Sequence, residues 1–464
     1  MNQIQNFRVP LTRRSFVKYA GYTAAAAAVA RPAWSRAIGA NDRINVAIIG
    51  LGDRGLHSHL RLLLEHRGHK PDIEIVALCD VYQRRLSQAS QLVPGAKTYT
   101  HHEDLLQRPD IDTVWVVTPD HWHAPITLMA MEHGKDVYVE KPMTHTVEEA
   151  KVVARRAKEL NRVVQVGVQG LSWDRWHKIR EIVDSGLIGQ VVEVEGTYSR
   201  NFLKIKGDWN YYTIDPTAGP AGAGDDHIDW KQWLGSAPQV PFNADRFFRF
   251  RKYWDYSGGI ATDLHYHIAA PFHVAVANDF PVRVVGMGGL WVTNDGREVP
   301  DTFLTAADYP GKYSLTIQSS QVNEHGPRTV IRGTKATINL SDEWEGPPER
   351  QYDYADIIPE SPFVEEFSKQ VEKLSKQHDS YCDTVSGNSC TGSIVRVDGV
   401  GNQGDLLHID NFLDCVRSRQ QPNCPADLGY KVEATIDLSV RSYRNGRMYY
   451  FDAENERVYE KSGS

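Results

Sequence analysis

The sequence predicts an α/β protein in which a parallel, doubly wound sheet is followed by an α+β region with a large, mostly antiparallel open sheet. From Ile44 to about Gly167, strand-like and helix-like stretches alternate, which is typical of a parallel sheet covered by helices. After Gly167 the apolar residues recur with a period closer to two, which is typical of strands with one solvated or interface face. We therefore expect two domains, residues 41–167 and residues 168–464, and the 464-residue chain has room for both cores.

The first 40 residues are predicted to be an export signal and are left out of the fold. Residues 12–18 (TRRSFVK) precede an alanine-rich apolar run that ends near Ala30 and offers small-residue cleavage sites. The RRxFxK core resembles a twin-arginine signal, and an ordinary basic, amphipathic helix is the alternative. The run is too short and too weakly apolar to predict a membrane span. We expect export to the periplasm, or otherwise out of the cytoplasm, with the twin-arginine translocase as a transient partner.

Residues 44–55 (INVAIIGLGDRG) carry the glycine pattern of a dinucleotide-binding turn. A β-branched apolar run predicts a buried strand, and it breaks at Gly50, Gly52 and Gly55 where a helical stretch begins. The first glycine of this pattern makes a tight turn, the second lets the backbone approach a pyrophosphate, and the third lets the helix pack on the strand. The amide groups at the helix N-terminus then favour the phosphate charge.

The next predicted strand, residues 73–79, ends at Asp80, about 25 residues beyond Gly55 and close to where this pattern places an acid on the adenosine ribose. A helix-capping aspartate in a domain without a ligand is the alternative. The agreement of glycines, setting and acid favours dinucleotide binding. An acid at this position favours NAD because it repels a 2′-phosphate, while Arg84 and Arg85 nearby leave NADP possible.

Polar side chains follow two further predicted strands of the parallel sheet. Strands are expected near 113–117, 136–139 and 163–167, and residues 118–123 (TPDHWH) and 140–142 (EKP) follow the first two. Ligands of parallel α/β sheets lie at the carboxyl ends of the strands. The sequence therefore places potentially reactive side chains where such a fold binds its ligands.

The second domain, residues 168–464, is predicted to have helices before and after its sheet in the sequence. A Trp-, Pro- and Gly-rich stretch at 206–260 has too ordered a composition for a linker, and 341–405 is expected to be a loop-rich insertion. The helices expected within 406–445 are predicted to pack back on the first domain. The remaining elements are a helix near 174–185 and strands near 190–199, 282–292, 302–308, 313–320 and 328–340.

The amino-acid composition limits the kinds of ligand that the protein is expected to bind. The formal net charge of -7 argues against a nucleic-acid surface. Eleven Trp and twenty-one Tyr supply flat faces that suit carbohydrate stacking, although most will be core. The five cysteines lack metal-site spacing, and whether Cys382 and Cys390 form a disulfide is left open.

Four stretches resemble the Gfo/Idh/MocA family of NAD(P)-dependent sugar oxidoreductases: TPDHWHAP (118–125), EKPM (140–143), GGIATDLHYH (258–267) and NFLDCVRSRQQP (411–422). The resemblance covers essentially everything after the signal. It implies an N-terminal Rossmann domain and a C-terminal open antiparallel sheet. The export signal is shared with members of the glucose-fructose oxidoreductase type.

The resemblance also implies catalytic roles for Lys141, Asp263 and His267. Lys141 would orient the substrate hydroxyl and stabilise developing alkoxide charge near the nicotinamide ribose. Asp263 and His267 are four residues apart and share one face of a helix. His267 would be the general base, and Asp263 would bind the substrate or orient the base. Without the resemblance, a solvated lysine, a surface aspartate and a satisfied helix histidine are the ordinary interpretations.

His265 stands where related sequences usually have glycine, which puts the detailed pocket shape in doubt. A metal site built on Asp263, His265 and His267 is compatible with the residue types. On a helix, however, His265 points about 160° away from His267, so no metal is predicted.

The other candidate residues follow from their places at the strand ends. Tyr253, Trp254 and Tyr256 are expected to form an aromatic wall over a sugar ring, with core packing as the alternative for each. Substrate contacts are also expected from His123 and Gln169. The predicted cofactor contacts are Gly50, Gly52, Asp53, Arg54, Gly55, Asp80, Thr118, Pro119, Asp120, His123, Glu140 and Lys141.

The leading functional hypothesis is hydride transfer between a sugar, glycoside or polyol hydroxyl carbon and a tightly held nicotinamide cofactor. One alternative is a redox-neutral, NAD-dependent glycosidase that oxidises, eliminates and reduces. Another is a non-catalytic sugar-binding or sensor protein. We expect a small carbohydrate as substrate and a homo-oligomer, dimer or tetramer, built through the C-terminal sheet.

Overall fold

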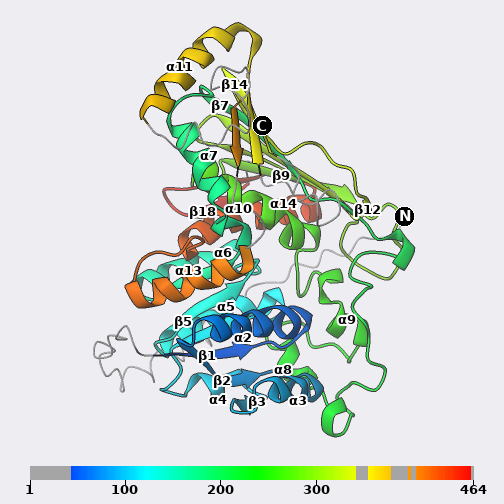
Figure 1. Cartoon of the computed structure of the whole chain (residues 1–464). Helices are drawn as coiled ribbons and strands as arrows, with labels where there is room; N and C mark the ends of the chain where they lie inside the picture. The colour runs from blue at the N-terminus through cyan, green and yellow to red at the C-terminus, as the bar shows by residue number, and fades with distance from the viewer. Residues whose placement is uncertain (1–42, 341–353, 378–394, 399–403, 461–464) are drawn as a thin grey trace, which may run out of the picture. The chain divides into compact units, whose positions relative to one another are not determined.

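A computed structural model describes residues 43–340, 354–377, 395–398 and 404–460 (Figure 1). The predicted signal, residues 1–40, and both Cys382 and Cys390 lie outside these ranges. Within the described ranges no helix is long and apolar enough to cross a membrane.

The N-terminal sheet has six parallel strands in the order β3-β2-β1-β4-β5-β6, which is the dinucleotide-binding order. The prediction of a doubly wound parallel sheet is therefore confirmed. β3 was not predicted because it is three residues long and exposes two of them. The strands are β1 (Ile44–Ile49), β2 (Ile73–Cys79), β3 (Lys97–Tyr99), β4 (Thr113–Val116), β5 (Asp136–Glu140) and β6 (Val164–Gly167).

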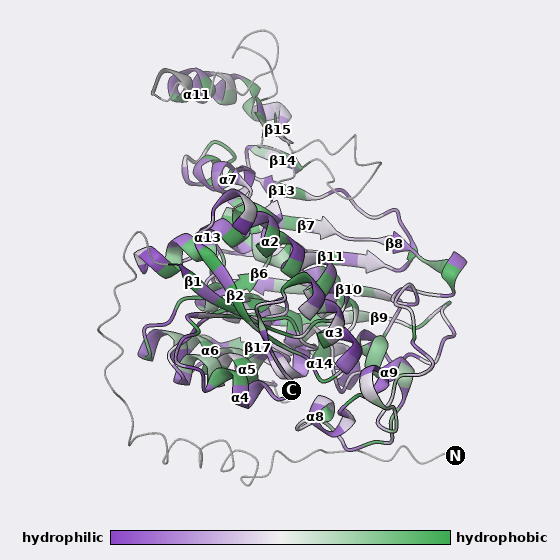
Figure 2. Ribbon diagram, turned by 60° about the horizontal axis from the view of Figure 1, so that its bottom comes forward, coloured by the Kyte–Doolittle hydropathy of each residue, from purple (hydrophilic) through white to green (hydrophobic). Residues whose placement is uncertain are grey.

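Helices follow each strand of this sheet, and the sequence marks where they begin. Every residue of β4 and β5 is buried, as expected for strands covered on both faces, and hydrophobic residues gather along the strands and the helices packed on them (Figure 2). A capping box of Thr146 and Glu149 starts the last helix of the domain. The helices are a π-helical turn η2 (Gly55–His59), α2 (Leu60–His69), α3 (Gln83–Leu92), α4 (His102–Leu106), α5 (Asp120–Glu132) and α6 (Val147–Glu159).

The C-terminal sheet has ten strands in the order β16-β15-β14-β13-β7-β11-β10-β9-β17-β18. Only the β7–β11 pair is parallel, so the predicted mostly antiparallel open sheet is also confirmed. Burial alternates strictly along β10, as expected for a sheet with one covered face. The strands are β7 (Val191–Thr197), β9 (Arg283–Gly289), β10 (Thr302–Tyr309), β11 (Tyr313–Ser320), β13 (Val330–Gly333), β14 (Ala336–Leu340), β15 (Tyr354–Pro359), β16 (Val395–Asp398), β17 (Tyr449–Asp452) and β18 (Arg457–Tyr459).

The described parts of 341–405, which were predicted as a loop-rich insertion, contain two strands and a helix. β15 and β16 extend the sheet beyond β14, and α11 (Val364–Gln377) lies between them. Phe367 and Val371 are the buried face of this otherwise polar helix. The strands escaped prediction because they are short, and pairing with neighbouring strands, as between Leu340 and Ala355, stabilises them.

Helices α13 (Gly404–Ser418) and α14 (Ala426–Asn445) join the two halves. α14 contacts α6 on one side and β9 on the other, and the amide of Val147 at the start of α6 donates to Asp437 of α14 at 2.8 Å. In α13, Nε2 of His408 lies 2.9 Å from the carbonyl oxygen of Val166 in β6. The two helices therefore anchor the parallel sheet to the C-terminal half.

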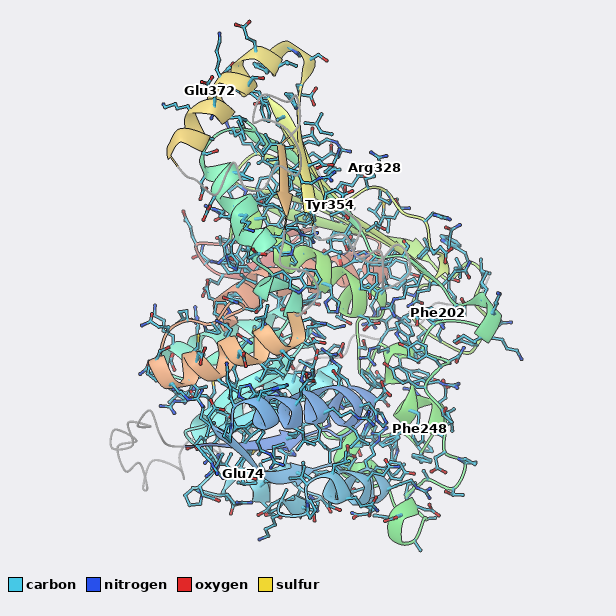
Figure 3. All side chains as sticks on the ribbon, in the orientation of Figure 1. Glu74, Phe202, Phe248, Arg328, Tyr354 and Glu372 are labelled. Atoms are coloured by element: carbon cyan, nitrogen blue, oxygen red, sulfur yellow. The ribbon has the colours of Figure 1, made fainter. Side chains whose placement is uncertain are left out.

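The aromatic stretch 206–260 packs against the Rossmann domain. Its short helices include α8 (Trp230–Leu234), α9 (Ala244–Phe248) and the 3₁₀ turn η6 (Phe250–Lys252). Tyr82, just after β2, forms a β-bridge with Ile228 and meets the ring of Phe248 edge-on at 6.1 Å (Figure 3). This stretch reaches across to the carboxyl ends of the parallel strands.

Candidate active site

A cleft of about 670 Å³ lies over the carboxyl ends of the parallel strands. One wall is the Rossmann domain, which contributes residues 50–54, Asp80, residues 118–120, Glu140 and Lys141. The other wall is the C-terminal half. Its lining side chains are Tyr211, Tyr212, Thr213, Ile214, Asp215, Pro216, Gln232, Trp233, Phe247, Phe248, Phe250 and Arg251.

The three glycines of the turn have the different surroundings that a dinucleotide site requires. Gly50 has a positive φ of 94°, and a Cβ there would lie 2.4 Å from the carbonyl oxygen of Val117. A Cβ on Gly55 would lie 2.1 Å from the carbonyl oxygen of Gly50. A Cβ on Gly52 would meet nothing closer than Arg85, at 3.6 Å. The outer glycines are thus required by the fold, and the middle one leaves room for a pyrophosphate, so the turn fits NAD.

Asp80 lies where the ribose-binding acid is expected. Its carboxylate accepts the amide of Leu51 at 2.6 Å and the amide of Tyr82 at 2.8 Å, which ties the end of β2 to the glycine turn. Each carboxylate oxygen keeps a second lone pair for a ribose hydroxyl. Arg85 stands 4.0 Å from this carboxylate, with its guanidinium 4.9 Å from the centre of the Phe247 ring.

The C-terminal half closes over the adenosine end of the cleft. The hydroxyl of Tyr82 donates to Asp215 at 2.7 Å, and the amide of Gln83 donates to the carbonyl of His227 at 3.1 Å. Arg84, one of the two arginines that left NADP possible, forms ion pairs with Asp215 and Asp226. These contacts use backbone as well as side chains, so both halves hold the cofactor site.

Glu140 and Arg54, both predicted cofactor contacts, bind each other at the floor of the cleft. Nε of Arg54 donates to Glu140 at 2.8 Å, and Nε2 of buried His59 lies 2.7 Å from the same oxygen. Burial acts to raise the pKa of Glu140, but the charge of Arg54 and the contact with His59 hold it well below its usual range. Sequence reasoning missed His59, which lies four residues after Gly55 on the turn that carries the glycine pattern.

Lys141 and Asp263, predicted as catalytic from two distant motifs, meet at the cleft. Nζ of Lys141 donates to Oδ1 of Asp263 at 2.9 Å and to its backbone carbonyl at 2.7 Å. Both side chains are about nine-tenths buried. The Lys141–Pro142 peptide bond is cis. The Rossmann strand β5 and the helical segment of the C-terminal half thus contribute one charged group each to a single ion pair.

Three further side chains, two of them hydrogen-bond donors, surround the carboxylate of Asp263. The indole Nε1 of Trp209 donates to Oδ2 at 2.9 Å, and Nε of Arg251 donates to Oδ1 at 3.1 Å. A guanidinium nitrogen of Arg200 lies 3.7 Å from Oδ2. Burial opposes ionisation, but Lys141 and the two arginines hold the pKa of Asp263 well below its usual range. Sequence reasoning missed all three residues, because nothing in their local sequence distinguishes them.

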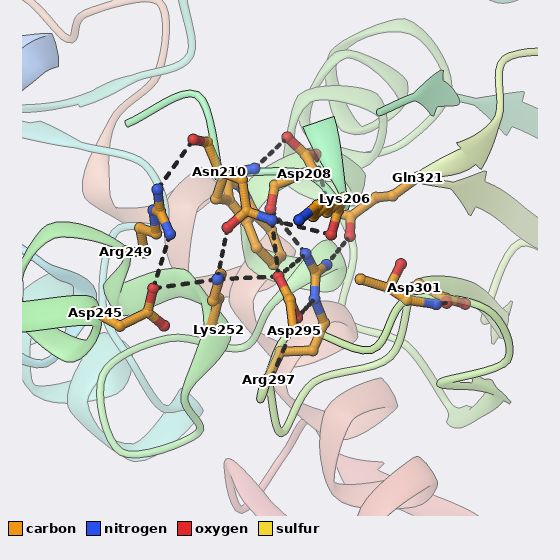
Figure 4. Close-up of polar contacts among 12 residues, drawn as sticks. Lys206, Asp208, Asn210, Asp245, Arg249, Lys252, Asp295, Arg297, Asp301 and Gln321 are labelled. Atoms are coloured by element: carbon orange, nitrogen blue, oxygen red, sulfur yellow. Dashed lines mark hydrogen bonds and ion pairs between the residues drawn. The ribbon is translucent and has the colours of Figure 1, made fainter. Parts of the chain in front are cut away.

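A network of buried charges around Asp295 and Arg297 (Figure 4) packs against Trp209. The guanidinium of Arg297 lies 5.1 Å from the centre of the Trp209 ring and is fully buried. Arg297 pairs with Asp295 at 2.8 Å and donates to Gln321 and to the carbonyl of Asp208. Trp209, with a positive φ of 66°, is itself fully buried. The indole that binds Asp263 is therefore fixed on both its faces and its edge by the surrounding chain.

His267 follows Asp263 across a change of helix type. Asp263 lies in the π-helical turn η7 (Ala261–His265), and His267 lies in α10 (Tyr266–Ala275). Burial and the charge of Lys141 lower the pKa of His267 to about 3, against the raising effect of Asp263. Its ring meets Tyr198 edge-on at 6.1 Å. His267 is thus a neutral imidazole in the electrostatic field of the Lys141–Asp263 pair.

His265 points away from this group. It is fully buried, and its Nδ1 lies 2.9 Å from the hydroxyl of Thr305 on β10. The His265 side chain, at a position where related sequences usually have glycine, is therefore buried against the C-terminal sheet. The described parts of the chain contain no group of three or more potential metal-ligating side chains.

The predicted contact of His123 with substrate or cofactor is wrong. His123 is buried, and its ring nitrogens lie 2.5 Å from the carbonyl oxygen of Pro142 and 2.8 Å from that of Thr118. It joins the segments that follow β4 and β5, and the sequence motif could not distinguish that role from ligand binding. Asp120, by contrast, lines the cleft, and its Oδ2 is buried without a partner among the described residues.

The predicted aromatic wall is also wrong. The hydroxyl of Tyr253 donates to Asp245 at 2.6 Å, Tyr256 packs fully buried against Trp233, and Trp254 lies against Tyr443. None of the three lines the cleft, and neither does Gln169, which begins the 3₁₀ turn η3 (Gln169–Ser172). Core packing, the ordinary alternative, holds for these aromatic residues. The aromatic side chains that do line the cleft are Tyr82, Trp122, Tyr211, Tyr212, Trp233, Phe247, Phe248 and Phe250.

The chain has the two-domain fold of NAD-binding oxidoreductases, with a cleft over the carboxyl ends of the parallel strands. Residues 44–168 match the family model described as "Oxidoreductase family, NAD-binding Rossmann fold". Residues 174–286 match the model described as "Oxidoreductase family, C-terminal alpha/beta domain". The two matches together span just over half of the chain, and the chain belongs to the Gfo/Idh/MocA oxidoreductase family.

Curated relatives match part of the chain. A "Glycosyl hydrolase family 109 protein" of Shewanella baltica is 32% identical over 188 residues, 38% of this chain and 39% of the relative. One of Saccharopolyspora erythraea is 34% identical over 183 residues, 37% of this chain and 39% of the relative. The chain thus matches about two fifths of the length of these relatives.

Solved structures share the fold over almost the whole chain. Levoglucosan dehydrogenase in complex with NADH and levoglucosan has a TM-score of 0.59 at 16% identity, and the match covers 90% of this chain and 99% of that one. The aldose-aldose oxidoreductase of Caulobacter crescentus has a TM-score of 0.59 at 17% identity, with coverage of 88% and 100%. At these identities the likeness establishes the fold alone.

Proposed function

We propose that this protein transfers a hydride between a sugar, glycoside or polyol hydroxyl carbon and a tightly bound nicotinamide cofactor. The observation that carries the proposal is the ion pair of Lys141 with Asp263, in which Lys141 lines the cleft that begins at the dinucleotide turn. A buried lysine ammonium held by a carboxylate is suited to bind a hydroxyl group and the charge that develops on it.

The chain's own residues divide the work as follows. The ammonium of Lys141 donates to the substrate hydroxyl and stabilises the oxygen as it loses its proton. The neutral imidazole of His267 accepts that proton, and Asp263 holds Lys141 in place through two hydrogen bonds. Because the pKa of this imidazole is low, His267 is a weaker base than an ordinary histidine and gives up the accepted proton readily.

The cofactor is held by the glycine turn and by Asp80. Gly52 would leave space for the pyrophosphate, the N-terminus of the helical segment that begins at Gly55 would favour its charge, and the carboxylate of Asp80 would receive the ribose hydroxyls. When bound, the nicotinamide accepts the hydride from the hydroxyl carbon or returns it. The closure of the adenosine end by Tyr82 and Gln83 supports slow exchange of the nucleotide.

The test begins with protein purified without added nucleotide. The protein is denatured, released dinucleotide is identified by mass, and the absorbance of the native protein at the NADH band is followed with a panel of sugars and glycosides. We expect about one nucleotide per chain, reduced by one class of sugar. A protein that binds neither NAD nor NADP contradicts the proposal.

A matched pair of variants assigns the chemistry to Lys141. Lys141→Ala should keep the nucleotide and lose its reduction by sugar, while Lys151→Ala, a partly exposed lysine on α6, should keep both. Unchanged behaviour of Lys141→Ala in every assay would favour a non-catalytic, sugar-binding or sensor protein.

A second candidate is a redox-neutral, NAD-dependent glycosidase. The names of the curated relatives favour it, since they are glycosyl hydrolases. In that cycle a ring hydroxyl is oxidised transiently, the neighbouring C–H becomes acidic, and the aglycone leaves before the ring is reduced. Release of nitrophenol from nitrophenyl glycosides without any net change in NADH absorbance would establish the glycosidase, whereas net NADH formation without release would establish the oxidoreductase.

We also propose that the protein works outside the cytoplasm and as a homo-oligomer. Residues 12–18 (TRRSFVK) support export through the twin-arginine translocase, and the open face of the C-terminal sheet supports a dimer or tetramer. Replacement of Arg13 and Arg14 by lysine should leave the precursor in the cytoplasm in a cell-fractionation assay. Light scattering on the exported protein should give a mass of two or four chains.

A further inference from the structure

Arg251 presents unused hydrogen-bond donors to the cleft, directly beside the catalytic lysine. Its Nε donates to the same Asp263 oxygen that Lys141 binds, at 3.1 Å and 2.9 Å respectively. Its guanidinium lies 4.6 Å from the centre of the Phe250 ring and 5.8 Å from that of Tyr212. No described residue accepts a hydrogen bond from either terminal nitrogen, and the side chain lines the cleft.

Arg200 adds a second cation that is only loosely paired. One guanidinium nitrogen lies 3.7 Å from Oδ2 of Asp263 and another lies 3.9 Å from Oδ2 of Asp208, both too long for a hydrogen bond. Its Nε is buried without a partner among the described residues. The side chain is 22% exposed, similar to the 20% of Arg251.

The nearby carboxylates neither balance the charge of these cations nor accept all of the hydrogen bonds that Arg200 and Arg251 can donate. Three cationic groups, Lys141, Arg200 and Arg251, lie within 4 Å of the single carboxylate of Asp263. Asp208 is fully buried, and its oxygens accept the amide of Trp209 and the amide group of Gln321. Asp120 lines the same cleft, but no ion pair joins it to Arg251 in the described part of the chain.

An arginine whose terminal N–H donors have no partner among the described residues is suited to bind an oxyanion. The guanidinium keeps its charge at any physiological pH, and leaving its donors unpaired when a substrate displaces water from the cleft is unfavourable. Its terminal edge presents two parallel N–H donors that match a carboxylate. A neutral hydroxyl satisfies one such donor and leaves the charge unbalanced.

We propose that the substrate carries an anionic group, which the terminal edge of Arg251 binds with Arg200 as the second cation. A carboxylate, as in a hexuronate or its glycoside, matches the planar edge, and a sulfate or phosphate ester offers the same charge. This assignment rests on the proposed function, because it names the substrate class of the same site. Arg251 and Arg200 are then the residues that determine charge specificity.

The test compares sugars that differ only at one carbon. Glucose and galactose are compared with glucuronate and galacturonate, and with glucose 6-phosphate and glucose 6-sulfate, on the nucleotide-loaded full chain. Affinity is measured by calorimetry, and reduction of the bound nucleotide by absorbance. We expect an acid to bind at least about tenfold more tightly than its neutral parent. Comparison of the affinities for the carboxylate, the phosphate ester and the sulfate ester then shows which anion the site prefers.

Variants at Arg251 link the preference to the guanidinium. Arg251→Gln should weaken binding of the preferred anionic sugar about ten- to hundredfold more than it weakens binding of the neutral parent, since both sugars feel any change at Asp263 but only the anion loses a charge partner. Arg251→Lys, which keeps the charge and loses the paired donors, should be intermediate. Arg447→Gln, at a 66% exposed arginine, is the control and should change neither affinity. An unchanged melting temperature of each variant checks that it has folded.

The outcomes separate this inference from the proposed function. Neutral sugars that bind and reduce the nucleotide as well as the acids do would overturn the anionic substrate and leave the oxidoreductase standing. A loss of nucleotide from Arg251→Gln, with unchanged melting of the protein, would also overturn it and assign Arg251 to the cofactor. Failure of every sugar, neutral or anionic, to bind or to change the nucleotide would overturn both.

Discussion

Replacing the glycines of the dinucleotide turn one at a time should separate folding from cofactor binding. A Cβ on Gly55 would lie 2.1 Å from the carbonyl oxygen of Gly50, about 1 Å inside the shortest separation that real Cβ atoms show. The obstacle is backbone, so the helix or the strand has to move. A Cβ on Gly52 would meet only the flexible end of Arg85, at 3.6 Å, which is ordinary contact.

The two alanine variants should therefore behave differently. Gly55→Ala should lose about 1–3 kcal/mol of stability or more, as overpacking does, and melt several degrees lower. Gly52→Ala should melt within about 1 °C of the parent when neither holds nucleotide, since a surface change without overlap costs within about 0.5 kcal/mol. Its methyl group occupies the space for the pyrophosphate, so its affinity for NAD should fall at least about tenfold, or about 1.4 kcal/mol.

The assay is a thermal melt of nucleotide-free protein together with calorimetric titration of NAD. Gly68→Ala serves as the control, because a Cβ there meets nothing within 4 Å and the residue lies near the end of α2. Equal destabilisation by Gly52→Ala and Gly55→Ala would refute the reasoning from the backbone distances. Unchanged NAD affinity in Gly52→Ala would refute the placement of the pyrophosphate.

Three further predictions concern the catalytic group. Lys141→Ala should retain the nucleotide and lower the rate of its reduction by substrate about 100- to 1000-fold in single-turnover absorbance measurements; a loss below tenfold would remove Lys141 from the chemistry. Burial and Lys141 lower the pKa of His267 to about 3, so this base stays neutral as the pH falls and kcat/KM should lack an acid limb between pH 7 and 5. A histidine of ordinary pKa would instead lose activity about 20- to 30-fold over that range. Trp209→Phe removes the indole donor to Asp263 and should lower kcat/KM about 10- to 100-fold without nucleotide loss; the same variant with full kcat/KM would show that this hydrogen bond does not position the carboxylate.

The fold of the first domain was predicted well from local sequence, because its strands and its glycine turn are each marked by residues that lie close together in the chain. The strands β1, β2, β4, β5 and β6 are short segments rich in buried apolar residues, and the glycine turn lies between a strand and a helix as its pattern requires. The EKP and DxxxH motifs singled out Lys141 and Asp263, which form one ion pair in the structure, and Lys141 lines the cleft. Their place at strand and helix ends follows from the fold class itself.

Tertiary structure decided what each remaining side chain contacts. His123, Tyr253 and Tyr256 belong to residue types that suit ligand binding and packing equally, and only their neighbours show that they are buried in the protein. β15 and β16 depend on pairing with a distant edge, which local propensity does not encode.

The sequence by itself determined the class of fold, the nucleotide turn with Asp80, and two of the charged groups of the candidate catalytic site. Only the tertiary structure brought Trp209, Arg200 and Arg251 onto Asp263, and only it closed the adenosine end of the cleft with the segment around Asp215. The physical reason is that periodicity and turn chemistry act between neighbouring residues, whereas hydrogen bonds and ion pairs depend on distances in space that chain separation does not fix.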